Sequence, residues 1–256
     1  MSTIIPILLA TLLGSIGALA GGFLLLFSRK RAQAISHVLV PFAAGALLAT
    51  GFFELLPEAS EHAVELGQDV NVFYWALGGV LLMYLLERGI HWFQYHRKTH
   101  KGVHGSVTVP LIILSDSAHN FIDGVAIAIT FLVNPSLGIV TTLAVAAHEL
   151  PQEIGDFAVL LHAGLSRKKI ILYNILSALL AVVGAVLALA IGEQIRAILP
   201  IALALTTGFF LYIALNSLLP EIHHEEKKGY AFLETTFLFL GVVVIWVAIT
   251  LLEGNH

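Results

Sequence analysis

Long apolar runs, separated by short polar segments, extend along the whole chain. Each contains about 20 or more residues, the length that an α-helix needs to cross roughly 30 Å of hydrocarbon. The eight runs cover residues 3–27, 37–57, 73–95, 107–133, 137–163, 169–192, 200–220 and 234–252. The pattern predicts an all-α integral membrane protein with eight transmembrane helices, folded as one polytopic domain over residues 1–256.

The composition supports a membrane environment. Hydrophobic residues make up 58% of the chain and charged residues only 12%, whereas soluble domains contain about 25% charged residues. The absence of cysteine excludes disulfides and thiolate metal ligands. The first run has no Lys or Arg before it and is longer than the apolar core of a signal peptide, so we expect a retained helix.

The basic residues predict an orientation. All but one of the 13 Lys and Arg residues lie in the segments 29–31, 88–101, 167–169 and 227–228, and the exception is Arg196. With eight helices these four segments fall on one side of the membrane, which the positive-inside rule makes cytoplasmic. We therefore expect a multi-pass protein of the cell membrane with both termini extracellular or periplasmic.

Polar residues interrupt the fourth and fifth apolar runs. The fourth contains Asp116, His119, Asn120 and Asp123, and the fifth contains His148, Glu149, Gln152, Glu153 and Asp156. At about 100° per residue, each set lies on one face of its helix. Because only residues 134–136 join the two runs, the helices are predicted to be antiparallel neighbours with both histidines near the middle of the membrane.

The cost of burying charge indicates what these residues do. One carboxylate at the bilayer centre costs about 2.5–3.5 kcal/mol on insertion scales, and neither run contains a Lys or Arg to neutralise its acids. A divalent cation, a water-filled cavity or protonation must do so instead. Imidazole, carboxylate and amide oxygen together are the donors that first-row divalent ions prefer. The alternative is a polar clamp that hydrogen-bonds two helices.

Two polar segments outside the helices each have two interpretations. The loop at about 91–105 contains four histidines among basic residues and is either a flexible metal-collecting loop or a plain basic loop. The segment 58–69 contains acidic residues and one histidine without a basic residue, and it is either a solvated loop or a mouth that concentrates cations.

A short sequence similarity links the second and seventh runs. Residues 50–53 and 207–210 both read TGFF, and residues 55–58 and 218–221 both read LLPE, with six more residues between the two pieces in the second copy. The predicted helices have opposite polarity. The similarity therefore suggests an inverted repeat of helices 1–3 and 6–8, as in many transporters.

These motifs resemble the signature of the Zrt/Irt-like (ZIP) metal transporter family. The family carries His-Asn-x-x-Asp/Glu-Gly on its fourth helix and, in a large branch, His-Glu-x-Pro-His-Glu on its fifth. The matching residues are His119, Asn120, Asp123 and Gly124, then His148, Glu149, Pro151 and Glu153. The eight helices and the His-containing loop extend the resemblance to essentially the whole chain.

The resemblance implies alternating-access transport of zinc toward the cytoplasm. It assigns His119, Asp123, His148 and position 152 to the main metal site. Asn120 and Glu149 are assigned to a second site, with Asp123 as the bridge. It makes Asp116 and Asp156 candidates for the exit path, and Glu153 another pathway residue. It also suggests a homodimer, with the metal as substrate and no catalytic cofactor.

This chain departs from the family pattern at two places. Gln152 replaces a histidine, which leaves the preferred ion open among zinc, iron, manganese, cadmium or a broad set. The sixth run has no carboxylate before Glu193, so the second metal position is expected to be weak or empty.

Other functions are less consistent with the sequence. An intramembrane zinc hydrolase of the His-Glu-x-x-His type lacks its second histidine at Gln152, and a haem carrier would place carboxylates around the haem. Nothing indicates a nucleic-acid partner; the expected partners are divalent ions and lipid.

Overall fold

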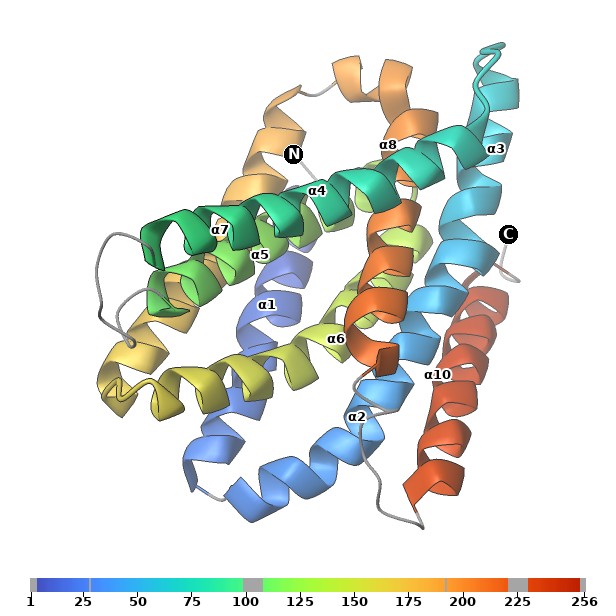
Figure 1. Cartoon of the computed structure of the whole chain (residues 1–256). Coiled ribbons are helices and arrows are strands. Elements are labelled where there is room, and N and C mark those ends of the chain that lie inside the picture. The colour runs from blue at the N-terminus through green and yellow to red at the C-terminus, as the bar shows by residue number, and fades with distance from the viewer. Residues whose placement is uncertain (1–3, 28, 99–107, 192, 221–229, 254–256) are drawn as a thin grey trace.

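The computed structural model describes residues 4–27, 29–98, 108–191, 193–220 and 230–253, and the chain is helical in nearly all of them (Figure 1). The helices are α1 (Ile4–Phe27), α2 (Arg29–Thr50), α3 (Leu56–Glu65), α4 (Val72–Lys98), α5 (Thr108–Val133), α6 (Pro135–His162), α7 (Arg167–Ile191), α8 (Glu193–Tyr212) and α10 (Tyr230–Glu253). Two π-helical turns, η1 (Gly51–Leu55) and η2 (Ile213–Leu218), extend α2 and α8. The predicted all-α class is confirmed.

Over its described residues each predicted apolar run coincides with a helical segment, except that the fifth run extends one residue beyond the end of α6 at His162. The second run belongs to one continuous helical segment from Arg29 to Glu65, because η1 joins α2 to α3 without a break. Pro57 lies in the first turn of α3, where its missing N–H costs little. The first part of the predicted loop at 91–105 is helical, because α4 continues to Lys98, and residues 99–105 lie outside the described residues.

Five helical segments among the described residues are long and apolar enough to cross a membrane. They cover His37–Glu65, Ile112–Val133, Arg167–Ile191, Ala197–Leu218 and Ala231–Leu251. The chain is therefore a multi-pass membrane protein by composition. The count of eight spans stays a prediction; α6 is not among the five, and Glu149, Glu153 and Asp156 all lie within that helix.

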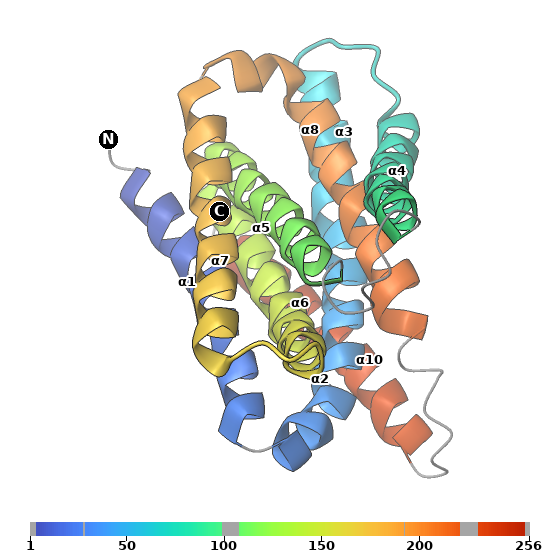
Figure 2. The ribbon, with the colours of Figure 1, turned by 60° about the vertical axis from the view of Figure 1, so that its left-hand side comes forward.

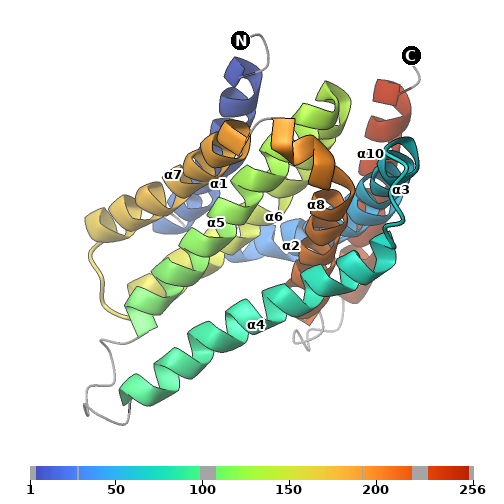
Figure 3. The same ribbon diagram turned by 90° about the horizontal axis from the view of Figure 1, so that it is seen from above.

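The helices form two sets. α5 packs mainly on α7, and α1 packs on α6. In the other set, α2 packs on α10 and α4 on α8, and the contact of α2 with α6 is the largest between the sets. Figures 2 and 3 show α5 and α6 between the α1 and α7 pair and the group formed by α3, α4 and α8.

Glycines allow the closest helix crossings. A Cβ atom on Gly124 of α5 would overlap the carbonyl oxygen of Ala181 on α7. A Cβ on Gly208 of α8 would likewise overlap the carbonyl oxygen of Ala76 on α4, where Gly79 faces it. Small residues let the helix backbones approach, and dispersion then stabilises packing that lipid does not drive.

The two π turns occupy corresponding positions. When residues 55–58 are aligned with residues 218–221, η1 falls opposite η2 and Gly45 opposite Gly208. Both glycines face a carbonyl oxygen of a neighbouring helix. In addition, η1 contacts α8 while η2 contacts α2. The sequence similarity thus coincides with matching local structure.

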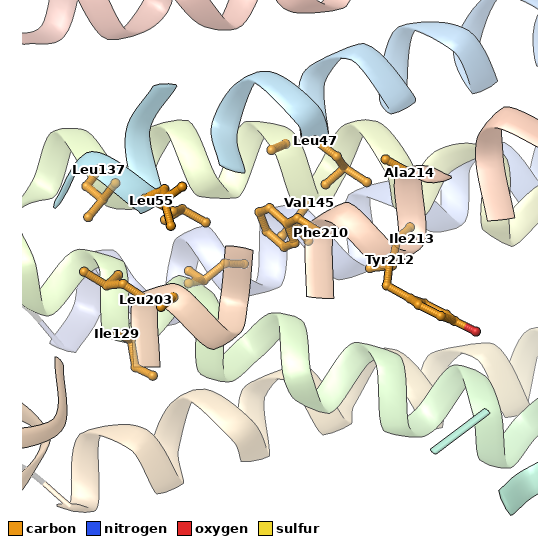
Figure 4. Packing of buried hydrophobic residues seen from close by; sticks show 14 of the residues in the cluster. Leu47, Leu55, Ile129, Leu137, Val145, Leu203, Phe210, Tyr212, Ile213 and Ala214 are labelled. Carbon is orange, nitrogen blue, oxygen red and sulfur yellow. The ribbon is translucent and has the colours of Figure 1, made fainter. Parts of the chain in front are cut away.

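An apolar cluster fills the space between α2, α5, α6 and α8 (Figure 4). Its labelled members include Leu47, Leu55, Ile129, Leu137, Val145, Leu203 and Phe210. Leu55 precedes α3, and Ile129 and Leu137 flank the short turn between α5 and α6. This part of the cluster lies toward the α3 end, whereas Tyr212, Ile213 and Ala214 extend the cluster to the other side of Phe210.

Candidate metal centre

Four side chains from α5 and α6 converge in the middle of the bundle. They are His119, Asp123, His148 and Glu149, and one donor atom of each lies within 4.8 Å of the others. The Nε2 atom of His148 is 3.3 Å from Nε2 of His119 and 3.3 Å from Oδ2 of Asp123. Its distance to Oε1 of Glu149 is 3.8 Å. The antiparallel pairing of the two polar faces produces this convergence.

The backbone of α6 selects the tautomer of His148. Its Nδ1 atom is 3.1 Å from the carbonyl oxygen of Ala144, one turn earlier. A carbonyl oxygen only accepts hydrogen bonds, so the proton lies on Nδ1 and Nε2 offers its lone pair to the centre. An outer hydrogen bond that orients the ring in this way is the usual support of a metal-ligating histidine.

A second group lies next to the first. It consists of Asp116, Glu149 and Glu153, whose donor atoms also lie within 4.8 Å of one another. Glu149 belongs to both groups, whereas the family resemblance gives Asp123 as the bridge. All three side chains are buried. One carboxylate therefore joins two neighbouring clusters along α6.

Amide side chains surround the second group. Asn120 donates from Nδ2 to Oδ1 of Asp116 at 2.9 Å, while its own Oδ1 is buried and accepts no hydrogen bond from the described residues. Gln152 of α6 and Ser177 of α7 are also polar neighbours of the Asp116 carboxyl. The amide of Gln152 therefore lies beside Asp116 of the second group, whereas the family resemblance assigned position 152 to the main site.

Asp156 lies outside both groups. It is half-buried and one turn beyond Glu153 on α6, so it extends the acidic face of that helix. Pro151 lies within the helical backbone of α6, and its side chain is outside the described ones.

The buried carboxylates lack partners that would offset their charge. Both oxygens of Asp123, Glu149 and Glu153 are buried and accept no hydrogen bond from any described residue. Neither α5 nor α6 contains a Lys or Arg. Leaving such groups unsatisfied is costly. Imidazole nitrogens and carboxylate oxygens that converge in this way fit a divalent cation, with zinc favoured by the nitrogens.

Two residues near the centre were not singled out from the sequence. Phe210 of α8 contacts the ring of His148, with ring centroids 6.2 Å apart. Glu87 of α4 interacts electrostatically with His119. The lone acid within the third apolar run was a usable signal for Glu87, whereas Phe210 has only its place in the repeated TGFF, which it shares with Phe52, Phe53 and Phe209.

Comparisons with known proteins give a consistent result. The family model described as ZIP zinc transporter matches residues 3–110 and 94–248. Zinc transporter ZIP10 of Danio rerio is 48% identical over 118 residues, which is 46% of this chain and 14% of that protein. Zinc transporter ZIP6 of Homo sapiens is 39% identical over 158 residues, or 59% of this chain and 21% of that protein. Zinc transporter ZIP13 of Pongo abelii is 32% identical over 222 residues, or 81% of this chain and 65% of that protein.

The chain spans only a small part of the first two relatives and 65% of ZIP13. The family match, in contrast, extends over nearly all of this chain. The matched segments include α5 and α6, which hold both groups of candidate ligands. The chain therefore belongs to the ZIP zinc transporter family.

Proposed function

We propose that this protein carries divalent metal ions, zinc first among them, across the cell membrane toward the cytoplasm. The observation that carries the proposal is the convergence of His119, Asp123, His148 and Glu149 in the middle of the bundle. The carboxylates among them have no basic partner in α5 or α6. The family membership adds that related proteins are named zinc transporters. The metal is the substrate, and the paired groups form its binding site.

Two adjoining ion positions are proposed. The first uses His119, Asp123 and His148 with Glu149, and the second uses Asp116 and Glu153 with Glu149 shared. The free oxygen of Asn120 supports its role as a further ligand. Gln152 supports the second position through Asp116, and Asp156 continues the path beyond it. Asp116 would supply the carboxylate that the sixth apolar run lacks.

The proposed topology has eight spans with both termini outside. The first residues of α1 and the last of α10 lie on the same side of the molecule in Figure 3, which supports an even number of crossings. The matching π turns and glycines support an inverted repeat of helices 1–3 and 6–8. The single polytopic domain and the homodimer stay predictions.

Alternating access is the proposed mechanism. The set α1, α5, α6 and α7 would move against α2, α4, α8 and α10, since packing is more extensive within each set than between them. Leu55, Leu137 and Leu203 of the apolar cluster lie on the α3 side of Phe210, and all three side chains are fully buried. This packing supports a state that is closed at the α3 end, so an ion would need the cluster to part.

The proposal is tested by competitive uptake into proteoliposomes with zinc, iron, manganese and cadmium. Saturable zinc uptake that the other ions inhibit to different degrees is expected. A broad-specificity carrier is the alternative within the same class. Absence of flux of any of the four ions into vesicles containing folded protein contradicts the transport function. A hydrolase is not favoured, because the matched relatives are named transporters and the zinc-protease motif lacks its second histidine.

The substitution Gln152→His is expected to strengthen zinc binding and increase the preference for zinc over manganese. An imidazole binds zinc more strongly than a neutral amide oxygen, and manganese prefers oxygen ligands. The ratio of zinc to manganese uptake measures the change. Gln68→His serves as the control, because Gln68 lies on the connection between α3 and α4 and bonds to Ala197. An unchanged ratio contradicts the placement of Gln152 beside the ions.

The substitution Asp116→Asn is expected to remove the second ion while the first is retained. It preserves shape and hydrogen-bonding capacity but removes the charge that the second position requires. Metal analysis of purified protein should show about half the bound zinc. Equal zinc content in both proteins, measured at saturation, contradicts a second position that depends on Asp116.

A further inference from the structure

Phe210 connects α8 to a proposed metal ligand on α6. Its side chain is fully buried and contacts the His148 ring edge-on, at a centroid distance of 6.2 Å and an interplanar angle of 60°. It also belongs to the apolar cluster, together with Val145, one turn before His148 on α6, and Leu55 and Leu203 of the cluster lie on its α3 side (Figure 4). The Phe210 ring of α8 thus contacts a proposed metal ligand and also belongs to the apolar cluster.

The opposite face of α8 is anchored to α4. The Tyr212 hydroxyl donates a hydrogen bond to Oε2 of Glu87, and the Asn216 amide donates to the same oxygen at 3.3 Å. Tyr212 immediately precedes η2 and Asn216 lies inside it. Glu87 therefore accepts one hydrogen bond from the residue before the π turn and one from within it. A π turn within an α-helix often marks a functional segment.

Residues 210 and 212 point in nearly opposite directions because two helical residues are separated by about 200°. A rotation of α8 that broke the Tyr212 bond to Glu87 would therefore also turn Phe210 away from His148. Sliding of α8 is opposed one turn earlier, where Gly208 packs against Ala76 and Gly79 of α4. The contacts of Tyr212 and Gly208 with α4 therefore fix the position of Phe210 on the opposite side of α8.

We propose that Phe210 is the gate residue that closes the metal centre toward α3 and orients His148, and that Glu87 with Tyr212 holds it in place. The inference rests on the proposed transport function. Phe210 and Tyr212 are positioning residues, since neither belongs to the two groups of metal donors. Opening the centre toward α3 then requires Phe210 to leave His148, and the bond between Tyr212 and Glu87 opposes that movement.

Cobalt absorption tests the orientation of His148. Cobalt replaces zinc in nitrogen and oxygen sites, and its visible bands depend on ligand geometry. Phe210→Leu is expected to shift these bands, and Tyr212→Phe is expected to shift them in the same direction but less. Tyr212→Phe keeps the charge of Glu87, which itself acts on His119. The controls are Phe239→Leu, on the exposed face of α10, and Tyr74→Phe, exposed on α4, and neither should change the spectrum.

Thiol labelling tests the closure. The chain contains no cysteine, so Val145→Cys provides a single reporter within the buried cluster. In detergent, a charged maleimide should react slowly with this protein and several-fold faster once Phe210→Ala is added. Adding Phe239→Leu instead should leave the rate unchanged. Size-exclusion chromatography and thermal melting establish that each compared variant is folded.

The outcomes distinguish a failure of the gate assignment from a failure of the proposed metal site. An unchanged cobalt spectrum in folded Phe210→Leu, or an unchanged labelling rate after Phe210→Ala, overturns the gate assignment. A Tyr212→Phe spectrum identical to that of the unsubstituted protein overturns the role of the Glu87 bridge. Failure of the unsubstituted protein to bind cobalt contradicts the proposed metal site instead, and the labelling rates still decide whether Phe210 closes the centre.

Discussion

Replacement of Asp123 by Ala is expected to reduce zinc uptake to the level of protein-free vesicles. Asp123 is fully buried on α5, and its Oδ2 atom lies 3.3 Å from Nε2 of His148. Removing it deletes one of the two negative charges that the first group offers a doubly charged ion, while both imidazoles stay in place. Uptake of radioactive zinc, normalised to the amount of protein in the membrane, measures the effect.

The matched control is Asp69→Ala. Asp69 is exposed between α3 and α4, so the same substitution there should leave uptake at saturating zinc close to normal. Membrane insertion of Asp123→Ala should be intact, because removing an unpartnered buried carboxylate lowers the cost of burial. Normal zinc uptake by Asp123→Ala at equal expression would refute the assignment of the metal site.

The polar faces of α5 and α6 could be predicted because helical periodicity alone aligns them. His119 and Asp123 are one turn apart, as are His148 and Gln152, and a short connection makes the helices antiparallel. The structure brings His119, Asp123 and His148 together as expected. Their role in metal binding stays a prediction for the uptake experiments.

Other features of the site could not be predicted, because they depend on contacts between helices that helical periodicity does not determine. The sharing of Glu149 between two groups depends on the rotation of α6 against α5, and a rotation of one residue step would change it. The neighbourhood of Gln152 and Asp116 depends on the same rotation. The π turns could not be predicted from composition, because their sequences, GFFEL in η1 and IALNSL in η2, do not differ from those of α-helices in a recognisable way. The contact of Phe210 with His148 joins helices far apart in sequence.

The substitution Gly124→Ala is expected to destabilise the protein by about 1–3 kcal/mol, as overpacking of a filled interior does. The added methyl group would overlap the backbone carbonyl of Ala181 on α7, and a backbone atom yields less readily than the end of a flexible side chain. On the same crossing, Gly184 of α7 faces the Phe121 carbonyl of α5, so the two helices have little freedom to separate locally. Thermal unfolding in detergent, with the yield of monodisperse protein, measures the loss.

The change at Gly17 of α1 should have the opposite sign, which makes the comparison decisive. A Cβ atom there meets no other atom within 4 Å, so Gly17→Ala adds only helix propensity, worth roughly 0.5–1 kcal/mol in favour of the folded state. If Gly124→Ala and Gly17→Ala unfolded at the same temperature, the close approach of α5 and α7 would be wrong. The position of α5 beside α6 would then lose its main support, because the α5–α7 crossing is the most extensive helix contact of α5.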